Sequence, residues 1–223
     1  MFSNRTSLNQ YQYPLNQTQM KNKYPYVFMD LSIKHPSDGI VERLGRLVIE
    51  LYDDIFPDGC YNFMKLCEGS IVDENDITKR KSYKDCLFYN IEHNYIAQSG
   101  DPINNNGKSA VTIFNNEPIP QNLIGDEIIP HIQKGLVSLV PFYLGTGIQA
   151  KPFYDSNFMI TLTDINLQEQ YDDDHIVIGK VVSEQGKRVL ELVNDSQKVF
   201  PMKIYPQIII SDCGIFTRGM DLS

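Results

Sequence analysis

Four cysteines and four histidines are the side chains of this 223-residue chain best suited to bind a metal ion or to act as nucleophiles. The thiols form no Cys-X-X-Cys pair, and the histidines have none of the spacings of zinc motifs. We therefore expect neither a metal site nor a cofactor. We interpret the thiols as free and buried in a reducing compartment. They are Cys60, Cys67, Cys86 and Cys213.

Three consecutive acids, Asp172–Asp174, precede His175 and could supply oxygen ligands to calcium. A turn on a solvated face explains the same run without any ligand, and we favour that interpretation. Taken alone, His175 fits a structural histidine, and Cys86 fits a packed thiol better than a nucleophile. These side chains by themselves therefore indicate no catalytic centre.

The overall charge excludes one class of partner. The formal net charge is −8 and the isoelectric point is near 5.0, so no basic surplus exists to replace phosphate counterions. We expect no nucleic-acid binding and interpret Lys79-Arg80-Lys81 as a solvated turn. The sequence has no run of eighteen apolar residues and no signal-peptide profile, which predicts a cytoplasmic protein without membrane association.

Short apolar segments separated by turn residues predict a series of β-strands. Two early strands are expected at Val27–Ile33 and Gly45–Tyr52, and the polar stretch 70–84 is expected to be a loop. The later strands are predicted at Cys86–Ile91, Tyr95–Gln98, Gly135–Val140, Asn157–Thr163, Ile176–Val181 and Ile208–Ile210.

Two segments have helical spacing. An apolar stripe at i, i+3, i+4 and i+7, in a helix that ends at Gly69, consists of Cys60, Phe63, Met64 and Cys67. A second amphipathic helix is predicted at 186–194. Many short strands with two helices indicate a mainly β protein, a closed antiparallel β-barrel capped by two α-helices.

The domain organisation follows from the same pattern. Residues 1–24 are a polar, Asn/Gln-rich extension that cannot bury enough apolar surface to order by itself. We expect residues 25–215 to form one domain and residues 216–223 to form a short tail. Tyrosines within the extension suit docking onto the domain or onto a second copy, so we expect some homo-oligomer formation through the extensions.

Several segments, in chain order, resemble the cyclophilins, a family of peptidyl-prolyl cis-trans isomerases (rotamases) that assist protein folding. The resemblance covers about residues 26–215 and implies a cyclophilin-like barrel. The Asn, Ile, Lys and Tyr bias and the extensions suggest a member encoded by a large DNA virus, acting in the host cytoplasm or the virion. The segments are VFMDLSI, GRLVIELYDDIFPDGCYNFMKLCEG, CLFYNIEHNYIAQSGDPINNNGKS, HIQKGLVSLV, SNFMITLTD, DDDHIVIGKVVSEQGKRVLELV and SDCG.

The resemblance identifies one departure in the catalytic motif. In the family, the arginine of Phe-His-Arg-Ile donates to the nitrogen of the twisting X–Pro amide. Here Tyr89 stands at the histidine position and Asn90 at the arginine position. Asparagine is shorter and uncharged, so it cannot replace a charge-assisted guanidinium donor. The resemblance therefore implies no intact catalytic residue and a rate loss on the order of 10²–10³.

The resemblance also implies a substrate groove that is only partly kept. Pro141 replaces an asparagine whose backbone N–H binds the peptide, and proline has no such donor. Gln170 replaces a tryptophan, so we expect poor cyclosporin binding, and the loop 143–156 is long enough to overhang the groove. The implied groove residues are Phe88, Asn90, Tyr95, Ile96, Gln98, Val140, Pro141, Phe142, Asn157, Phe158, Met159, Gln170, Tyr171 and His175.

Three functions remain open from the sequence. The first is a module that binds proline-containing peptides or proteins, with weak or absent isomerase activity. The second is a working isomerase that uses Gln98, His175 or a displaced arginine, for which Arg43, Arg46 and Arg80 are candidates. The third is a structural or assembly protein that makes its contacts through the terminal extensions.

Overall fold

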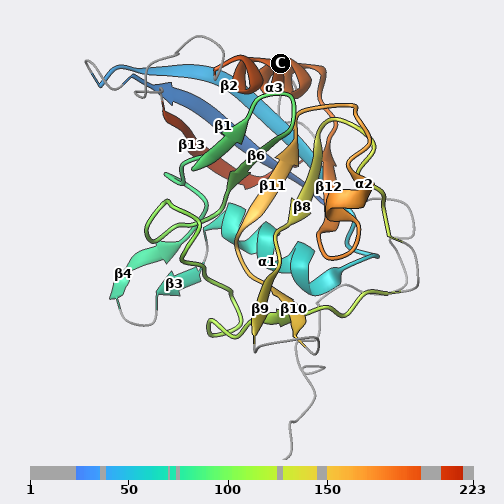
Figure 1. Ribbon diagram of the computed structural model, residues 1–223. Helices are drawn as coiled ribbons and strands as arrows, with labels where there is room; N and C mark the ends of the chain where they lie inside the picture. Colours follow the sequence, from blue (N-terminus) through green and yellow to red (C-terminus); the bar gives the residue numbers. More distant parts are fainter. Residues whose placement is uncertain are drawn as a thin grey trace, which may run out of the picture.

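A computed structural model of the chain describes residues 24–35, 39–69, 71–73, 76–124, 128–144, 150–196 and 207–217, with the backbone alone at 71–73 and 76–80. The predicted extension, apart from Tyr24, and the tail beyond residue 217 lie outside these ranges. Within them the fold is mainly β, as the sequence predicts (Figure 1). None of the described helices is both long and apolar enough to cross a membrane.

Eight strands form one antiparallel sheet, the main sheet, in the order β13-β1-β2-β12-β8-β11-β6-β5. Each corresponds to one of the eight strands that the sequence predicts. Their bounds are β1 Tyr26–Lys34, β2 Val41–Leu51, β5 Asn90–Glu92, β6 Ile96–Ser99, β8 Leu136–Leu139, β11 Phe158–Thr161, β12 Ile176–Val181 and β13 Gln207–Ile215.

The main sheet is open, so the prediction of a closed barrel is wrong. Its edges are β13 and β5, and the segment before β5 makes only a short contact with β13. Phe88 N donates to Ile208 O at 2.9 Å, and Ile210 N donates to Cys86 O at 2.9 Å. The chain enters this contact from a turn at Asp85, whose φ of 68° is left-handed. It then continues as β5, which pairs with β6, so the ladder with β13 stays short.

The other described strands form two smaller sheets, and none of these strands is among those predicted from the sequence. One sheet has the order β7-β10-β9, and the other is a hairpin of β3 and β4. Most of these strands are only two to four residues long, and the longest, β4, is polar, so strand periodicity does not detect them. The bounds are β3 Ile71–Asp73, β4 Asp76–Lys81, β7 Ile119–Pro120, β9 Phe142–Leu144 and β10 Lys151–Tyr154.

Lys81 departs from the predicted solvated turn. Its side chain is buried, and Nζ donates to Asn116 Oδ1 at 2.9 Å and to Thr112 O at 3.4 Å. The interpretation of Lys79-Arg80-Lys81 as a solvated turn is therefore wrong. All three residues lie in β4, and at Lys81 backbone and amide oxygens replace water around the ammonium group.

Within the described ranges three helices accompany the sheets: α1 Pro57–Glu68, α2 Gln168–Tyr171 and α3 Glu184–Asp195. α1 ends at Gly69, whose φ of 62° suits glycine and whose N–H donates to Lys65 O. α3 begins at Ser183, whose Oγ accepts from Gly186 N at 3.0 Å. The two predicted helices are confirmed. The third, α2, is a single turn without an apolar stripe.

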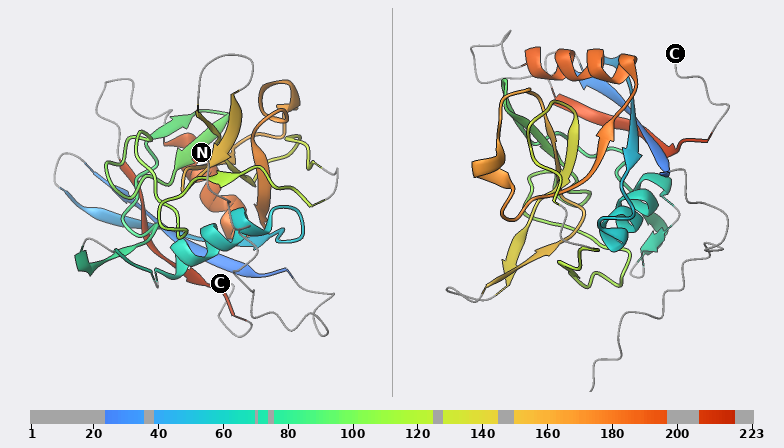
Figure 2. Two further views of the ribbon diagram at one scale, coloured as in Figure 1. Left: turned by 90° about the horizontal axis from the view of Figure 1, so that it is seen from below. Right: turned by 90° about the vertical axis from the view of Figure 1, so that its right-hand side faces the viewer.

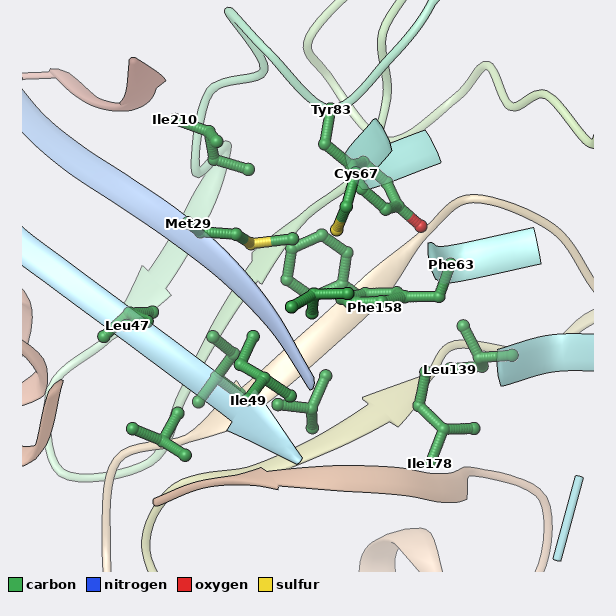
Figure 3. Packing of buried hydrophobic residues seen from close by; sticks show 14 of the residues in the cluster. Met29, Leu47, Ile49, Phe63, Cys67, Tyr83, Leu139, Phe158, Ile178 and Ile210 are labelled. Carbon is green, nitrogen blue, oxygen red and sulfur yellow. The ribbon is translucent and has the colours of Figure 1, made fainter. Parts of the chain in front are cut away.

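The core lies between α1 and the inner face of the main sheet, and Figure 2 shows α1 and α3 at opposite ends of that sheet. Phe158 is fully buried at its centre. Its ring centroid is 5.2 Å from those of Phe63 and Tyr83, both in edge-to-face geometry. Figure 3 shows these rings beside Met29 and Cys67.

Cys60, Cys67 and Cys86 are buried free thiols, as predicted, whereas Cys213 is half-buried.

Candidate functional site

The hydrogen-bond register of the main sheet places several predicted site residues in one row, on the face of the sheet that points away from the core. Asn90 of β5 lies opposite Gln98 of β6, and Gln98 lies opposite Met159 of β11. Opposed residues in an antiparallel ladder share one face, and so do residues two apart along a strand. Ile96 therefore joins this row, whereas Phe158 points to the core.

An apolar cluster, which we call the apolar floor, covers this face. Tyr171 connects it to the neighbouring rings, with ring centroids 5.8 Å from Tyr95 and 4.7 Å from His175. Apolar side chains edged by aromatic rings suit a small apolar ring of a ligand. The floor consists of Ile96, Met159 and Leu167, which are buried, and Tyr95, Val140 and Tyr171, which are half-buried.

The amide of Asn90 is already hydrogen-bonded within the protein. Its Nδ2 donates to Gln98 Oε1 at 2.9 Å and to Glu92 Oε1 at 3.0 Å. A side-chain amide has two N–H donors, so both are used here. Asn90 is among the groove residues that the resemblance implies, but in this geometry neither N–H group of its amide is available to a ligand.

No described arginine side chain faces the apolar floor. Arg46 makes a two-pronged contact with Asp30 on β1, at 2.8 and 2.7 Å, and its guanidinium lies 4.1 Å from the Phe28 ring centroid. Arg43 lies 3.6 Å from the same carboxylate. Arg188 is exposed on α3. The side chain of Arg80 lies outside the described residues.

A hollow of about 360 Å³ adjoins the floor, and we call it the side hollow. It shares Val140 with the floor, and its rim carries the predicted groove residues Pro141 and Phe142. Tyr89 Oη donates to Asn157 Oδ1 at 3.1 Å across its wall. Burial raises the pKa of Tyr89, which keeps the phenol neutral.

A buried acid holds the loop that forms the other wall of the hollow. Asp101 accepts backbone N–H bonds from five residues between positions 103 and 109. Although burial opposes it, these bonds lower the pKa of Asp101 and keep it charged. Gly107, with φ 75°, lies so close to the Tyr89 ring that a Cβ would meet it at 2.7 Å. The loop therefore packs directly on Tyr89.

Asp155 is a second buried acid, and it lines the side hollow itself. Its Oδ1 accepts from Asn157 N at 2.7 Å and from Asn157 Nδ2 at 3.1 Å. Burial raises its pKa from 3.8 to about 6, because these two bonds do not offset the lost hydration. The sequence analysis missed this residue. The signal in the sequence that could have found it is a single acid, Asp155, shortly before the apolar strand β11.

His131 is the other residue that the sequence analysis missed, although it opens one of the segments quoted for the resemblance. It is fully buried, and Nδ1–H donates to Asp172 Oδ1 at 2.6 Å while Nε2 accepts from Ser138 Oγ at 2.8 Å. Burial lowers the pKa of His131, so the ring is neutral. Because Asp172 follows Tyr171 directly, this contact fixes the turn that carries a ring of the apolar floor.

Asp174 fixes the far end of the same turn. His175 Nδ1 donates to Asp174 Oδ1 at 2.6 Å, and Tyr143 Oη donates to Asp174 Oδ2 at 2.5 Å. Tyr154 Oη donates to Asp174 O at 2.6 Å. Burial lowers the pKa of His175. β9 and β10 are thereby attached to the turn that follows α2.

The structure distributes the predicted site residues over four locations. The first group lies on or beside the apolar floor: Asn90, Tyr95, Ile96, Gln98, Val140, Met159, Tyr171 and His175. The second group lines the side hollow: Tyr89, Val140, Pro141, Phe142 and Asn157. Phe88 and Phe158 lie in the core, and Gln170 is exposed on α2.

A family model described as cyclophilin type peptidyl-prolyl cis-trans isomerase/CLD matches residues 38–215. The chain belongs to the cyclophilin family. The family assignment covers the main sheet from β2 onward together with the apolar floor and the side hollow.

The relatives include a viral protein and cellular isomerases. A structural PPIase-like protein of Acanthamoeba polyphaga mimivirus is 38% identical over 216 residues, which cover 92% of this chain and 87% of that protein. Peptidyl-prolyl cis-trans isomerase D of Kluyveromyces lactis is 28% identical, over 88% of this chain and 47% of that protein. The crystal structure of the mimivirus cyclophilin has a TM-score of 0.70 and 37% identity, covering 92% and 95% of the two chains. The viral relative fits the expectation of a divergent viral cyclophilin.

Asp155 provides a test of the site's electrostatics. Its pKa is raised in the folded state, so the charged form costs stability above pH 6, and the cost disappears as pH falls below 3.8. Asp155→Asn should raise the free energy of unfolding by roughly 2–3 kcal/mol near pH 7 and change it little below pH 3.8. Urea unfolding at the two pH values measures this.

The matched control is Glu191→Gln, which removes an equal charge from an exposed position on α3. It should change stability by less than about 1 kcal/mol. An Asp155→Asn protein that is less stable than wild type near pH 7 would contradict the assignment of a buried carboxylate whose charged form lowers the stability of the fold.

Proposed function

We propose that this cyclophilin binds proline-containing peptide segments and catalyses their isomerisation weakly or not at all. The observation that carries the proposal is the hydrogen bonding of Asn90. Both of its N–H donors go to Gln98 and Glu92, so neither is available to a ligand. The position that provides the donor in the family therefore provides none here.

The chemistry explains why this one donor matters. Rotation about an X–Pro bond must overcome a barrier of about 18–20 kcal/mol, which comes from amide resonance. In the twisted amide the nitrogen lone pair is no longer conjugated, so a donor aimed at it stabilises the transition state selectively. Loss of one such donor costs about 3–4 kcal/mol elsewhere in enzymes. An apolar groove can still bind the ground state.

The part of the implied groove that is kept can still bind a proline-containing segment. The apolar floor offers Met159, Ile96 and the Tyr95 ring to a proline ring. Gln98 uses its Oε1 for Asn90, and within the described part of the chain its Nε2 group donates to no protein atom. That group is available to a peptide carbonyl. Pro141, at the rim of the side hollow, removes one backbone donor, so we expect weaker affinity than a groove with an N–H there.

The alternative of a working isomerase requires another cation at the groove. Arg43 and Arg46 were candidates for this role, but both are directed to Asp30 on β1. His175 is half-buried, hydrogen-bonded to Asp174 and neutral near pH 7, because burial lowers its pKa. These observations favour the binding function over the catalytic one.

Restoring the guanidinium tests the proposal. Asn90→Arg should raise kcat/KM for an Ala-Pro peptide by at least about tenfold, since a charge-assisted donor returns to the twisted amide. A protease-coupled isomerisation assay measures the rate. The wild-type protein should accelerate the reaction far less than an active family member.

Asn90→Gln is the matched control, because it lengthens the side chain without adding charge, and it should give no gain in rate. High wild-type turnover that Asn90→Arg leaves unchanged would overturn the proposal and favour a rearranged catalytic groove.

A second candidate function is assembly of a larger particle. It is favoured by the viral relative that is named a structural PPIase-like protein and by the polar, tyrosine-containing extension of this chain. In this case the domain is a spacer and residues 1–24 make the contacts. Peptide binding in the groove does not exclude this role.

Removal of the extension tests the second candidate. If the extension drives assembly, light scattering should report an oligomer for the full chain and a monomer after deletion of residues 1–23. A monomeric mass for both proteins at equal concentration would remove the support for assembly through the extension.

A further inference from the structure

The side hollow is large enough to take a side chain of a bound peptide. Its volume of about 360 Å³ lies at the lower end of the range of about 300–1,000 Å³ for ligand pockets. It opens beside Val140, which also belongs to the apolar floor. A peptide whose proline rests on the floor can therefore direct a neighbouring side chain into the hollow.

Asp155 is the charged group that is fixed in the wall of this hollow. Its side chain is more than nine-tenths buried. Oδ1 accepts both bonds from Asn157, whereas Oδ2 accepts none from the described residues. Among those residues, every side-chain nitrogen or oxygen that is fully shielded from solvent has a hydrogen-bond partner. Because Oδ2 has no partner, it is not fully shielded and has access to the hollow that Asp155 lines. One carboxylate oxygen is thus open to a donor from a ligand.

The two lysines near the hollow do not neutralise this carboxylate. Lys81 Nζ is already bonded to Thr112 O and Asn116 Oδ1, two residues that line the hollow. Lys108 is exposed at the rim, and the described residues include no ion pair for it. Asp101 remains charged but points into its own ring of five backbone N–H groups. The open oxygen of Asp155 therefore favours a cationic donor.

We propose that the side hollow selects a lysine or arginine side chain next to the proline of the bound peptide, with Asp155 Oδ2 as the acceptor. This inference rests on the proposed function, because it names the class of peptide that the groove prefers. An ammonium or guanidinium group would supply the donor that the carboxylate lacks. The bond is charge-assisted and shielded from water, so it contributes more than an exposed pair does.

A lysine scan of a short peptide tests the proposal. The probes are Ac-Ala-Ala-Pro-Ala-amide and versions in which one residue flanking the proline is replaced by Lys or by Glu, titrated against ¹⁵N-labelled protein. One Lys position should lower Kd by about fivefold or more relative to Ala, and Glu at that position should raise it. The largest shift changes should include Asp155 and Asn157.

Two variants identify the acceptor. Asp155→Asn should abolish the preference for Lys, so that the Lys and Ala peptides bind with equal affinity, since the amide keeps the contact to Asn157 but carries no charge. Lys108→Glu, at the exposed rim, should strengthen binding of the Lys peptide without touching the core. Glu191→Gln is the charge-matched control and should change neither affinity.

The pH dependence adds a separate readout. Asp155 interacts electrostatically with Asp101, Tyr89 and Tyr83, and Lys108 lines the same hollow. The lowered pKa of Asp101 keeps that acid charged, and the raised pKa values of Tyr83 and Tyr89 keep both phenols neutral. The preference for Lys should therefore fall as pH drops through about 6 and vanish in Asp155→Asn.

The outcomes separate this inference from the proposed function. Equal affinity for the Ala, Lys and Glu peptides would overturn the inference and leave peptide binding intact. A Lys preference that survives Asp155→Asn would also overturn it. Absence of binding for every peptide would remove both proposals.

Discussion

The hydrogen-bond register between β5, β6 and β11 determines which side chains meet a ligand and which build the core. Residues alternate between two faces along a strand, so Phe158 enters the core while Met159, its neighbour, lies on the apolar floor. A slip of one residue would exchange these roles. The rings packed around Phe158 hold the register, because a slip would expose them. The groove is therefore maintained by the same packing that stabilises the fold.

The same register brings Asn90 within reach of Gln98, and this pair separates binding from catalysis. In a cyclophilin, an arginine at this position reaches out to the substrate amide. Here the shorter amide turns back onto Gln98 and Glu92. The apolar floor depends on other residues and is unaffected. A groove can thus keep its affinity for a proline ring and lose the interaction that distinguishes the transition state from the ground state.

Much of the fold follows from periodicity in the sequence, and the misses have physical causes. The apolar stripe of α1, its end at Gly69 and the eight strands of the main sheet are local patterns. Closure of the sheet is not local, since it depends on how the segment before β5 meets β13. The hairpin of β3 and β4 is polar, and α2 is one turn long, so neither has a hydrophobic period.

The candidate site likewise contains residues that the sequence locates and residues that it does not. Positions matched by resemblance, such as Asn90 and Met159, could be located from the sequence alone. His131 and Asp155 could not, because their importance comes from burial and from partners distant in sequence. His131 meets Asp172 only after the turn that follows α2 has folded against it. The carboxylate of Asp155 acquires its raised pKa only when the side hollow forms around it.

Exchange NMR on a proline peptide tests the central claim most directly, because one experiment reports both binding and turnover. The account predicts shift changes at Ile96, Gln98 and Met159 that saturate with peptide, while the cis and trans peptide signals show no exchange above the uncatalysed rate. Fast cis-trans exchange in the presence of catalytic amounts of the wild-type protein would contradict it.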